Sequence, residues 1–88
     1  MKIKDGFVLE EVAGSFIAVA LGKEAQNFNG FVKMNSTGAF LWNLLAKESQ
    51  TEDSLVSALL ESYEVDEKTA RADVKALLSK LIGASIVE

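Results

Sequence analysis

Apolar and polar residues alternate in the first third of the chain, which is the pattern of β-strands. Residues 7–12 (FVLEEV) lead through Ala13-Gly14, a pair that suits a hairpin turn, into residues 15–21 (SFIAVAL). Apolar side chains occupy both faces of this second run, so it is expected to be buried on both sides. We therefore predict that residues 15–21 form the middle strand of a small antiparallel sheet.

A polar segment separates these two strands from a third one. Residues 22–30 (GKEAQNFNG) have glycine at both ends and are predicted to form a loop. Residues 31–34 (FVKM) follow as a short strand in which Val32 and Met34 share one face. Because residues 15–21 take the middle position, this third strand is predicted to lie at an edge of the sheet.

The hydrophobic period becomes that of helices after residue 34. Asn35 and the two hydroxyl residues after it supply N-cap chemistry ahead of a first helix around residues 39–45. Thr51 is the predicted N-cap of a second helix, and Asp66 is that of a third. The predicted core stripe of the second helix is Leu55, Val56, Leu59, Leu60 and Tyr63. That of the third helix is Ala70, Val74, Leu77 and Leu81, before an end at Gly83 and a short closing strand at 84–88.

The order of elements is thus three strands followed by three helices, an α+β arrangement. Short connections between the helices favour a compact, helix-turn-helix-like cluster packed on one face of the three-stranded antiparallel sheet. Eighty-eight residues suffice for one hydrophobic core but not for two, and no repeat or linker interrupts the chain. We therefore predict a single domain over residues 1–88.

The composition removes several kinds of chemistry. The chain has neither cysteine nor histidine, which excludes disulfides, thiolate nucleophiles, zinc sites of the usual ligand types and triads with an imidazole base. Acidic residues adjoin at positions 10–11, 52–53 and 66–67, but neighbouring side chains diverge in strands and helices. We therefore predict no catalytic activity, no metal and no cofactor.

Charge and hydropathy narrow the choice of partners. The net charge of −4 argues against binding to nucleic acid, which depends on cationic side chains. The longest apolar run, residues 16–21, is far shorter than the ~20 residues that span a membrane. Charged residues follow Met1 at once, where a signal peptide would have its apolar core. We therefore expect a cytoplasmic protein that does not enter a membrane.

One segment carries a resemblance to a known family. Residues 34–45 (MNSTGAFLWNLL) are similar to the L-N-x-T-G-A-x-x-W-x-L-L segment of the PqqD-like family. Residues 51–56 and 63–66 resemble that family's second helix and its junction to the third, and residues 73–81 resemble its third helix. The resemblance covers essentially the whole chain in the same order of elements. It implies a non-catalytic peptide-recognition element of winged helix-turn-helix type.

The resemblance also implies a partner and a binding site. Such elements hold the leader of a ribosomally made precursor peptide and present the rest to a modifying enzyme, often a radical S-adenosylmethionine enzyme. The leader would add as a strand at residues 31–34, with the third helix as the other wall of a groove. Arg71 and Lys75 would meet acidic leader side chains, above an apolar floor. The residues expected to bind the peptide are Phe31, Val32, Lys33, Met34, Arg71, Val74, Lys75 and Leu78.

These residues also have structural interpretations. The strand at 31–34 could be an ordinary edge whose lysine discourages aggregation. Arg71 and Lys75 could simply form a solvated helix face. Trp42 is interpreted as a core residue, whereas its exposure would indicate a docking surface for a partner enzyme. Gly38 is predicted to let the first helix pack closely against the sheet.

Two other functions stay open at this point. A winged-helix nucleic-acid binder would bind duplex DNA in a salt-sensitive way. A scaffold subunit would instead co-purify with its enzyme without needing a peptide.

A monomer and a dimer formed by edge pairing or strand exchange are both compatible with the sequence. For leader binding we predict an affinity on the order of micromolar, because ordering a flexible peptide costs about 2–5 kcal/mol. The identity of the final product, pyrroloquinoline quinone or another, stays open.

Overall fold

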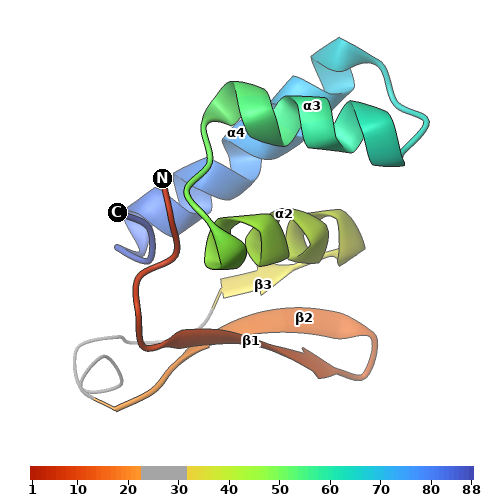
Figure 1. Cartoon of the computed structure of the whole chain (residues 1–88). Coiled ribbons are helices and arrows are strands. Elements are labelled where there is room, and N and C mark those ends of the chain that lie inside the picture. The colour runs from red at the N-terminus through yellow and green to blue at the C-terminus, as the bar shows by residue number, and fades with distance from the viewer. Residues whose placement is uncertain (23–31) are drawn as a thin grey trace.

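Three antiparallel strands are followed by three helices, so the predicted α+β fold is confirmed (Figure 1). The computed structural model describes residues 1–22 and 32–88. The strands are β1 (Phe7–Val12), β2 (Ser15–Ala20) and β3 (Val32–Met34), and the helices are α2 (Ser36–Lys47), α3 (Glu52–Ser62) and α4 (Glu67–Gly83). The predicted loop at 22–30 lies almost entirely outside the described residues, as does Phe31.

The sheet has the order β1-β2-β3, which confirms β2 as the middle strand. Ala13 and Gly14 join β1 to β2 with φ angles of 51° and 80°. Two successive residues with positive φ make a tight turn whose twist matches that of the flanking strands. The short hairpin therefore fixes the register of β1 against β2, and β3 is left at the edge of the described sheet.

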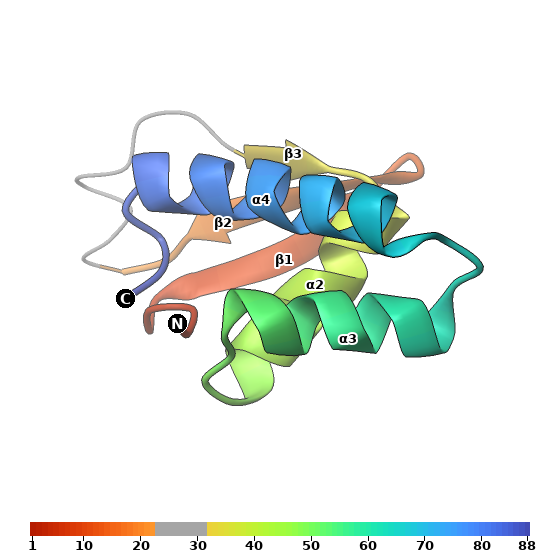
Figure 2. The same ribbon diagram turned by 90° about the horizontal axis from the view of Figure 1, so that it is seen from above.

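The described helices all lie on one face of the sheet (Figures 1 and 2). Ala18 of β2 is fully buried beneath them, and Met34 of β3 is 7 % exposed. Ile17 and Val19 point to the opposite face and stay partly exposed, because no described helix covers that face. The prediction that β2 is buried on both sides is therefore wrong, since its outward apolar residues are shielded only by neighbouring strands.

The structure confirms Thr51 and Asp66 as N-caps and makes Asn35 the N-cap among the three residues predicted to supply it for the first helix. The N–H of Gly38 donates to the side chain of Asn35 at 2.9 Å, and the N–H of Thr69 donates to Asp66 at 2.7 Å. Thr51 and Ser54 form a reciprocal capping box, with N···O distances of 2.9 and 3.0 Å. These bonds satisfy N–H groups that have no partner within a helix. The three helix starts are thus set locally.

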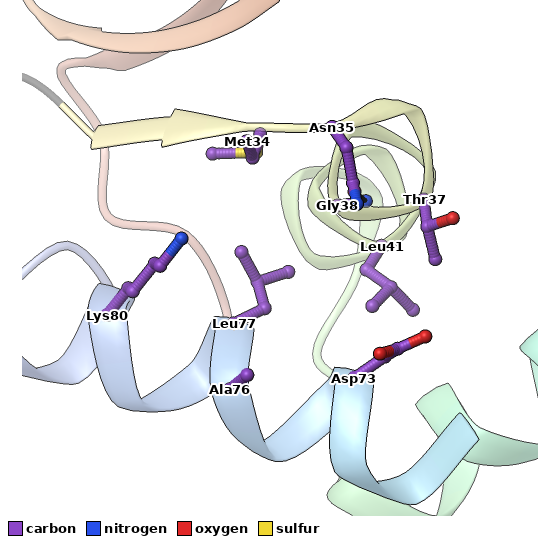
Figure 3. Close-up of a pocket in the computed structure, with 9 residues that line it drawn as sticks. All are labelled: Met34, Asn35, Thr37, Gly38, Leu41, Asp73, Ala76, Leu77 and Lys80. Carbon is purple, nitrogen blue, oxygen red and sulfur yellow. Dashed lines mark hydrogen bonds between the residues drawn. The ribbon is translucent and has the colours of Figure 1, made fainter. Parts of the chain in front are cut away.

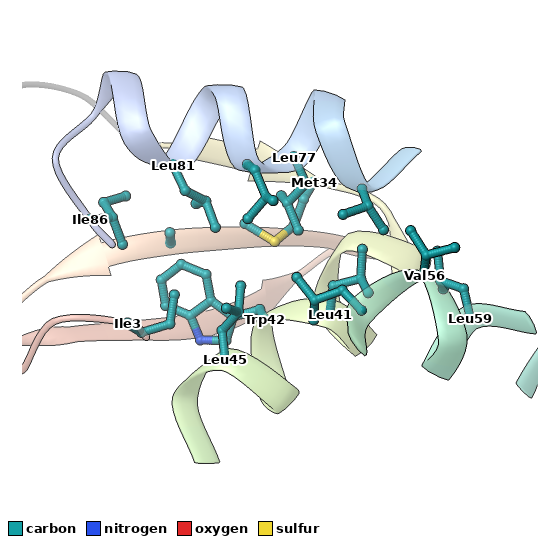
Figure 4. Close-up of a cluster of buried hydrophobic side chains, with 14 of the residues drawn as sticks. Ile3, Met34, Leu41, Trp42, Leu45, Val56, Leu59, Leu77, Leu81 and Ile86 are labelled. Carbon is teal, nitrogen blue, oxygen red and sulfur yellow. The ribbon is translucent and has the colours of Figure 1, made fainter. Parts of the chain in front are cut away.

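The core is a continuous apolar layer between the sheet and the helices (Figure 4). Trp42 lies within it at 2 % exposure, which confirms its interpretation as a core residue. Leu60 and Tyr63, predicted to belong to the stripe of α3, are 38 % and 37 % exposed. That prediction is wrong because α3 buries only a narrow face against its neighbours. The ring of Tyr63 instead packs edge-on to Phe40, with centroids 5.4 Å apart.

The two ends of the described chain meet beside α4 (Figure 1). Ile3 and Val87 form an isolated antiparallel bridge, and Lys2 and Glu88 exchange backbone hydrogen bonds. The predicted closing strand at 84–88 is therefore a single bridge to the N-terminal segment. Ile3 and Ile86 are 5 % and 0 % exposed, so this bridge closes one end of the core.

Candidate functional site

The edge of β3 that faces away from β2 pairs with no strand among the described residues. Exposed Glu10 and Glu11 protect the other sheet edge, on β1, with negative charge. The exposed side chain within β3 is Lys33, which points to the sheet face opposite the helices. The β3 edge is therefore the better one for accepting a further strand.

Helix α4 runs alongside β3 (Figure 2). Two adjoining hollows lie between them and are together called here the β3–α4 groove. Figure 3 shows the residues that line the first hollow. The first hollow is a cavity of about 130 Å³. It is lined by Met34, Asn35, Thr37, Gly38, Leu41, Asp73, Ala76, Leu77 and Lys80. The second is open and shallow, and it is lined by Val32, Lys33, Lys80, Gly83 and Ala84. Lys80 borders both hollows, so they form one continuous groove.

Close packing at Gly38 shapes the inner wall of this groove. A Cβ atom on Gly38 would lie 2.8 Å from the Cβ of Met34, nearer than two carbon atoms can pack. Glycine therefore lets the first turn of α2 lie directly against the end of β3, as the sequence predicted. Leu41, one turn further along α2, then faces Leu77 across the groove (Figure 3).

The structure places the four predicted residues of α4 away from β3. Val74 is fully buried in the core, beneath the helix. Lys75 and Leu78 line a different groove, together with Ile82 of α4 and Met1 of the N-terminal segment. Their proposed contact with a peptide along β3 therefore does not follow from this geometry, because the helix turns that flank away from the strand.

Arg71 is occupied by a contact between helices. Its guanidinium lies 2.7 Å from a carboxylate oxygen of Glu52 and 3.1 Å from one of Asp53. Hydrogen bonds from Arg71 to Asp53 and then to Glu52 raise its pKa above the usual value. Glu52 and Asp53 also stand in the first turn of α3, where the positive end of the helix dipole stabilises their negative charges. Arg71 therefore joins α4 to the start of α3, a role that the sequence analysis did not predict.

The residues of α4 that do face β3 were not among those predicted. They are Asp73, Ala76, Leu77, Lys80 and Gly83. Both flanks of the buried stripe have helical spacing, so periodicity alone does not tell which flank faces β3. The sequence did contain one signal for the correct flank, since this flank carries the small residues Ala76 and Gly83. Small residues are suited to the side of a helix that lies close to a strand.

The described side chains of the groove offer both apolar and charged contacts. Apolar groups lie at its centre, Lys80 lies toward one end, and the carboxylate of Asp73 lies at the other. Among residues 1–22 and 32–88, no group of three or more acidic side chains is placed to hold a metal ion. The described helices include none long and apolar enough to span a membrane.

Comparisons with known proteins agree with this geometry. The sequence profile of Coenzyme PQQ synthesis protein D (PqqD) matches residues 7–87. The structure of TbiB1 in complex with the TbiA(beta) leader peptide has the same fold, with a TM-score of 0.74 and 24 % identity. The match covers 100 % of this chain and 95 % of that one. No match to this sequence is found among curated proteins. Because the profile extends from β1 to the closing bridge, this chain belongs to the PqqD family.

Proposed function

We propose that this protein binds the leader segment of a ribosomally made precursor peptide by adding it as a strand to β3. The observation that carries the proposal is a strand edge without a partner among residues 1–22 and 32–88, lying beside a groove with an apolar centre. Family membership supports it, as does a shared fold with TbiB1, which was solved with a leader peptide bound. Residues 1–88 act as one recognition unit in this proposal.

Strand addition suits the chemistry of this site. Backbone hydrogen bonds to β3 supply affinity whatever the peptide sequence, and the groove selects among side chains. Val32, Lys33 and Met34 keep the role that the sequence analysis gave them. On α4 the contacting residues are Asp73, Ala76, Leu77 and Lys80, in place of the opposite flank. A groove this short fits an affinity on the order of micromolar.

The bound protein presents the remainder of the precursor to a separate modifying enzyme, for which a radical S-adenosylmethionine enzyme is the expected class. The protein catalyses no step itself in this scheme: it holds the leader, and the separate enzyme carries out the chemistry. The encounter takes place in the cytoplasm, where ribosomes make the precursor.

Backbone amide shifts recorded during titration with a leader peptide encoded beside this gene test the proposal. We expect shifts to concentrate on Val32–Met34 and on the α4 residues that face them. Ala76→Asp is expected to weaken binding at least about tenfold, because it places a charge beside the apolar centre at an exposed position of α4. Lys75→Ala is the matched control on the opposite side of α4 and is expected to bind normally.

Two results would count against the proposal. The absence of shifts with every leader encoded nearby would favour a scaffold subunit that needs no peptide. Shifts centred on Lys75, Leu78 and Ile82 would instead place the peptide in the other groove beside α4.

A further inference from the structure

Charge is distributed unevenly along the β3–α4 groove. Asp73 of α4 lies at the end nearest Asn35 and Thr37, where β3 passes into α2 (Figure 3). Lys80 lies two turns further along α4 and borders both hollows of the groove. Lys33 of β3 also borders the hollow at this end, but its side chain points to the sheet face opposite the helices. The groove thus has one acidic end and one basic end.

The cavity between these ends has room for one side chain. Its volume is about 130 Å³, and its apolar lining includes Met34, Leu41 and Leu77. A dry protein cavity of ~150 Å³ holds a benzene molecule, so this one fits a single leucine-sized or phenylalanine-sized group. An apolar residue inserted here would fix the position of a peptide along β3.

The sheet indicates the direction in which such a peptide runs. β1, β2 and β3 pair in antiparallel fashion throughout, and antiparallel pairing is slightly the more stable kind. A peptide antiparallel to β3 begins near Asn35 and ends near Val32. Its N-terminal part therefore lies at the acidic end of the groove, and its C-terminal part lies at the basic end.

Strand periodicity then determines which peptide residues face the helix. Alternate residues point to the same side and advance by about 6.8 Å for every two positions. When one residue fills the cavity, the residue two positions later points toward Lys80. The residue two positions earlier points toward Asp73, where a carboxylate would be repelled.

We propose that this groove selects leader segments in which an apolar residue is followed, two positions later, by an acidic residue. Met34, Leu41 and Leu77 hold the apolar residue, Lys80 pairs with the acid, and Asp73 rejects the reversed order. This inference rests on the proposed function and deepens it, since it specifies the sequence class of the leader and its direction.

Two fluorescein-labelled dodecapeptides of equal composition test the proposal with the full chain. Both have a serine, threonine and valine background with one central leucine. One has aspartate two positions after the leucine, and the other has aspartate two positions before it. We expect the first to bind about tenfold more tightly by fluorescence anisotropy, the factor that corresponds to one favourable charge contact. This preference should shrink as salt is raised.

Substitutions at exposed positions assign the preference to its residues. Lys80→Glu is expected to abolish or reverse the preference, and Asp73→Asn to reduce it. Lys75→Glu makes the same charge change on the opposite side of α4, and it should leave the preference intact.

Equal binding of the two peptides, or a preference unaffected by Lys80→Glu, would overturn the inference. So would a failure of both peptides to bind while the encoded leader still shifts Val32–Met34. The proposed function would stand in each of these cases, whereas it fails if the encoded leader itself produces no shifts.

Discussion

Single residues set the geometry of the groove through contacts that leave little room for change. At Gly38 the absence of a side chain lets α2 touch β3, and the same contact forms the wall of the cavity. At Asp66 a side-chain oxygen begins the helix that forms the opposite wall. The groove therefore depends on residues that need not touch the peptide at all.

Replacing Gly38 with alanine is expected to destabilise the fold by about 1–3 kcal/mol, because the new methyl group would overlap Met34 and force β3 and α2 apart. Denaturant titration followed by circular dichroism measures the change. Gly83→Ala is the matched control, since nothing lies within 4 Å of its Cβ position. Equal stabilities for the two variants would show that the Gly38 contact is not tight.

The pKa of Asp66 predicts a dependence of stability on pH. Hydrogen bonds from the backbone and then the side chain of Thr69 hold this pKa below its usual value. A carboxyl group with a lowered folded pKa stabilises the fold above its unfolded pKa of about 3.9, and the contribution is lost as pH falls through the folded value. Asp66→Asn keeps an N-cap acceptor but cannot titrate.

The melting temperatures of wild type and Asp66→Asn should therefore converge as pH is lowered from about 6 to about 3. Thermal melts followed by circular dichroism at several pH values measure this difference. A difference that stays constant over the range would mean that the Asp66 carboxylate gains nothing from its bonds to Thr69.

At the scale of elements, α4 has two flanks with different uses. One faces β3 across the proposed peptide groove, and the other faces α3 and the N-terminal segment. Arg71 secures the second flank through its bonds to Glu52 and Asp53, which stand in the first turn of α3. This ion pair helps to fix the rotation of α4 about its axis, and hence which residues meet β3.

Arg71→Gln is expected to lower the melting temperature slightly at low salt, with the loss shrinking as salt rises from about 0.05 M to about 1 M. The pair is partly exposed, so salt screens it. Thermal melts across that range measure the effect. Lys75→Gln removes the same charge one turn along α4, where no ion pair is found among the described side chains, and should show a smaller dependence on salt. Identical behaviour of the two variants would argue that Arg71 contributes only through net charge.

At the scale of the whole molecule, one apolar core joins the sheet, the helices and both ends of the described chain. Trp42 lies at its centre and is the single tryptophan of the sequence. Because β-strands, α2 and α4 share these contacts, neither the hairpin nor the helix pair has a separate core to retain. The protein should therefore unfold in one step.

Unfolding followed by Trp42 fluorescence and by far-ultraviolet circular dichroism should give coincident transitions in urea. The fluorescence reports the core, and the dichroism reports the helices. Ile3→Ala should move both curves to lower urea together, since its side chain closes the core from the N-terminal segment. Separate midpoints for the two signals would contradict a single domain over residues 1–88.

Local chemistry in the sequence determined most of the secondary structure. Asn35, Thr51 and Asp66 cap the helices through bonds within three residues, and Ala13-Gly14 makes the tight turn. Such bonds form wherever the segment is placed, so they can be recognised without tertiary information. The family resemblance carried by residues 34–45 likewise followed from the sequence, and the profile match confirmed it.

Tertiary structure alone decided which flank of α4 faces β3, and that Leu60 and Tyr63 of the predicted stripe stay exposed. A hydrophobic stripe fixes only the direction that points into the core, and the two flanks beside it are equivalent in periodicity. The position of α4 over β3 depends on contacts between segments far apart in sequence, such as the ion pair of Arg71 with Glu52 and the place of Leu77 beside Met34 and Leu41. The strand of the proposed site could therefore be inferred from the sequence, whereas its helix residues became visible only when these contacts oriented the helix.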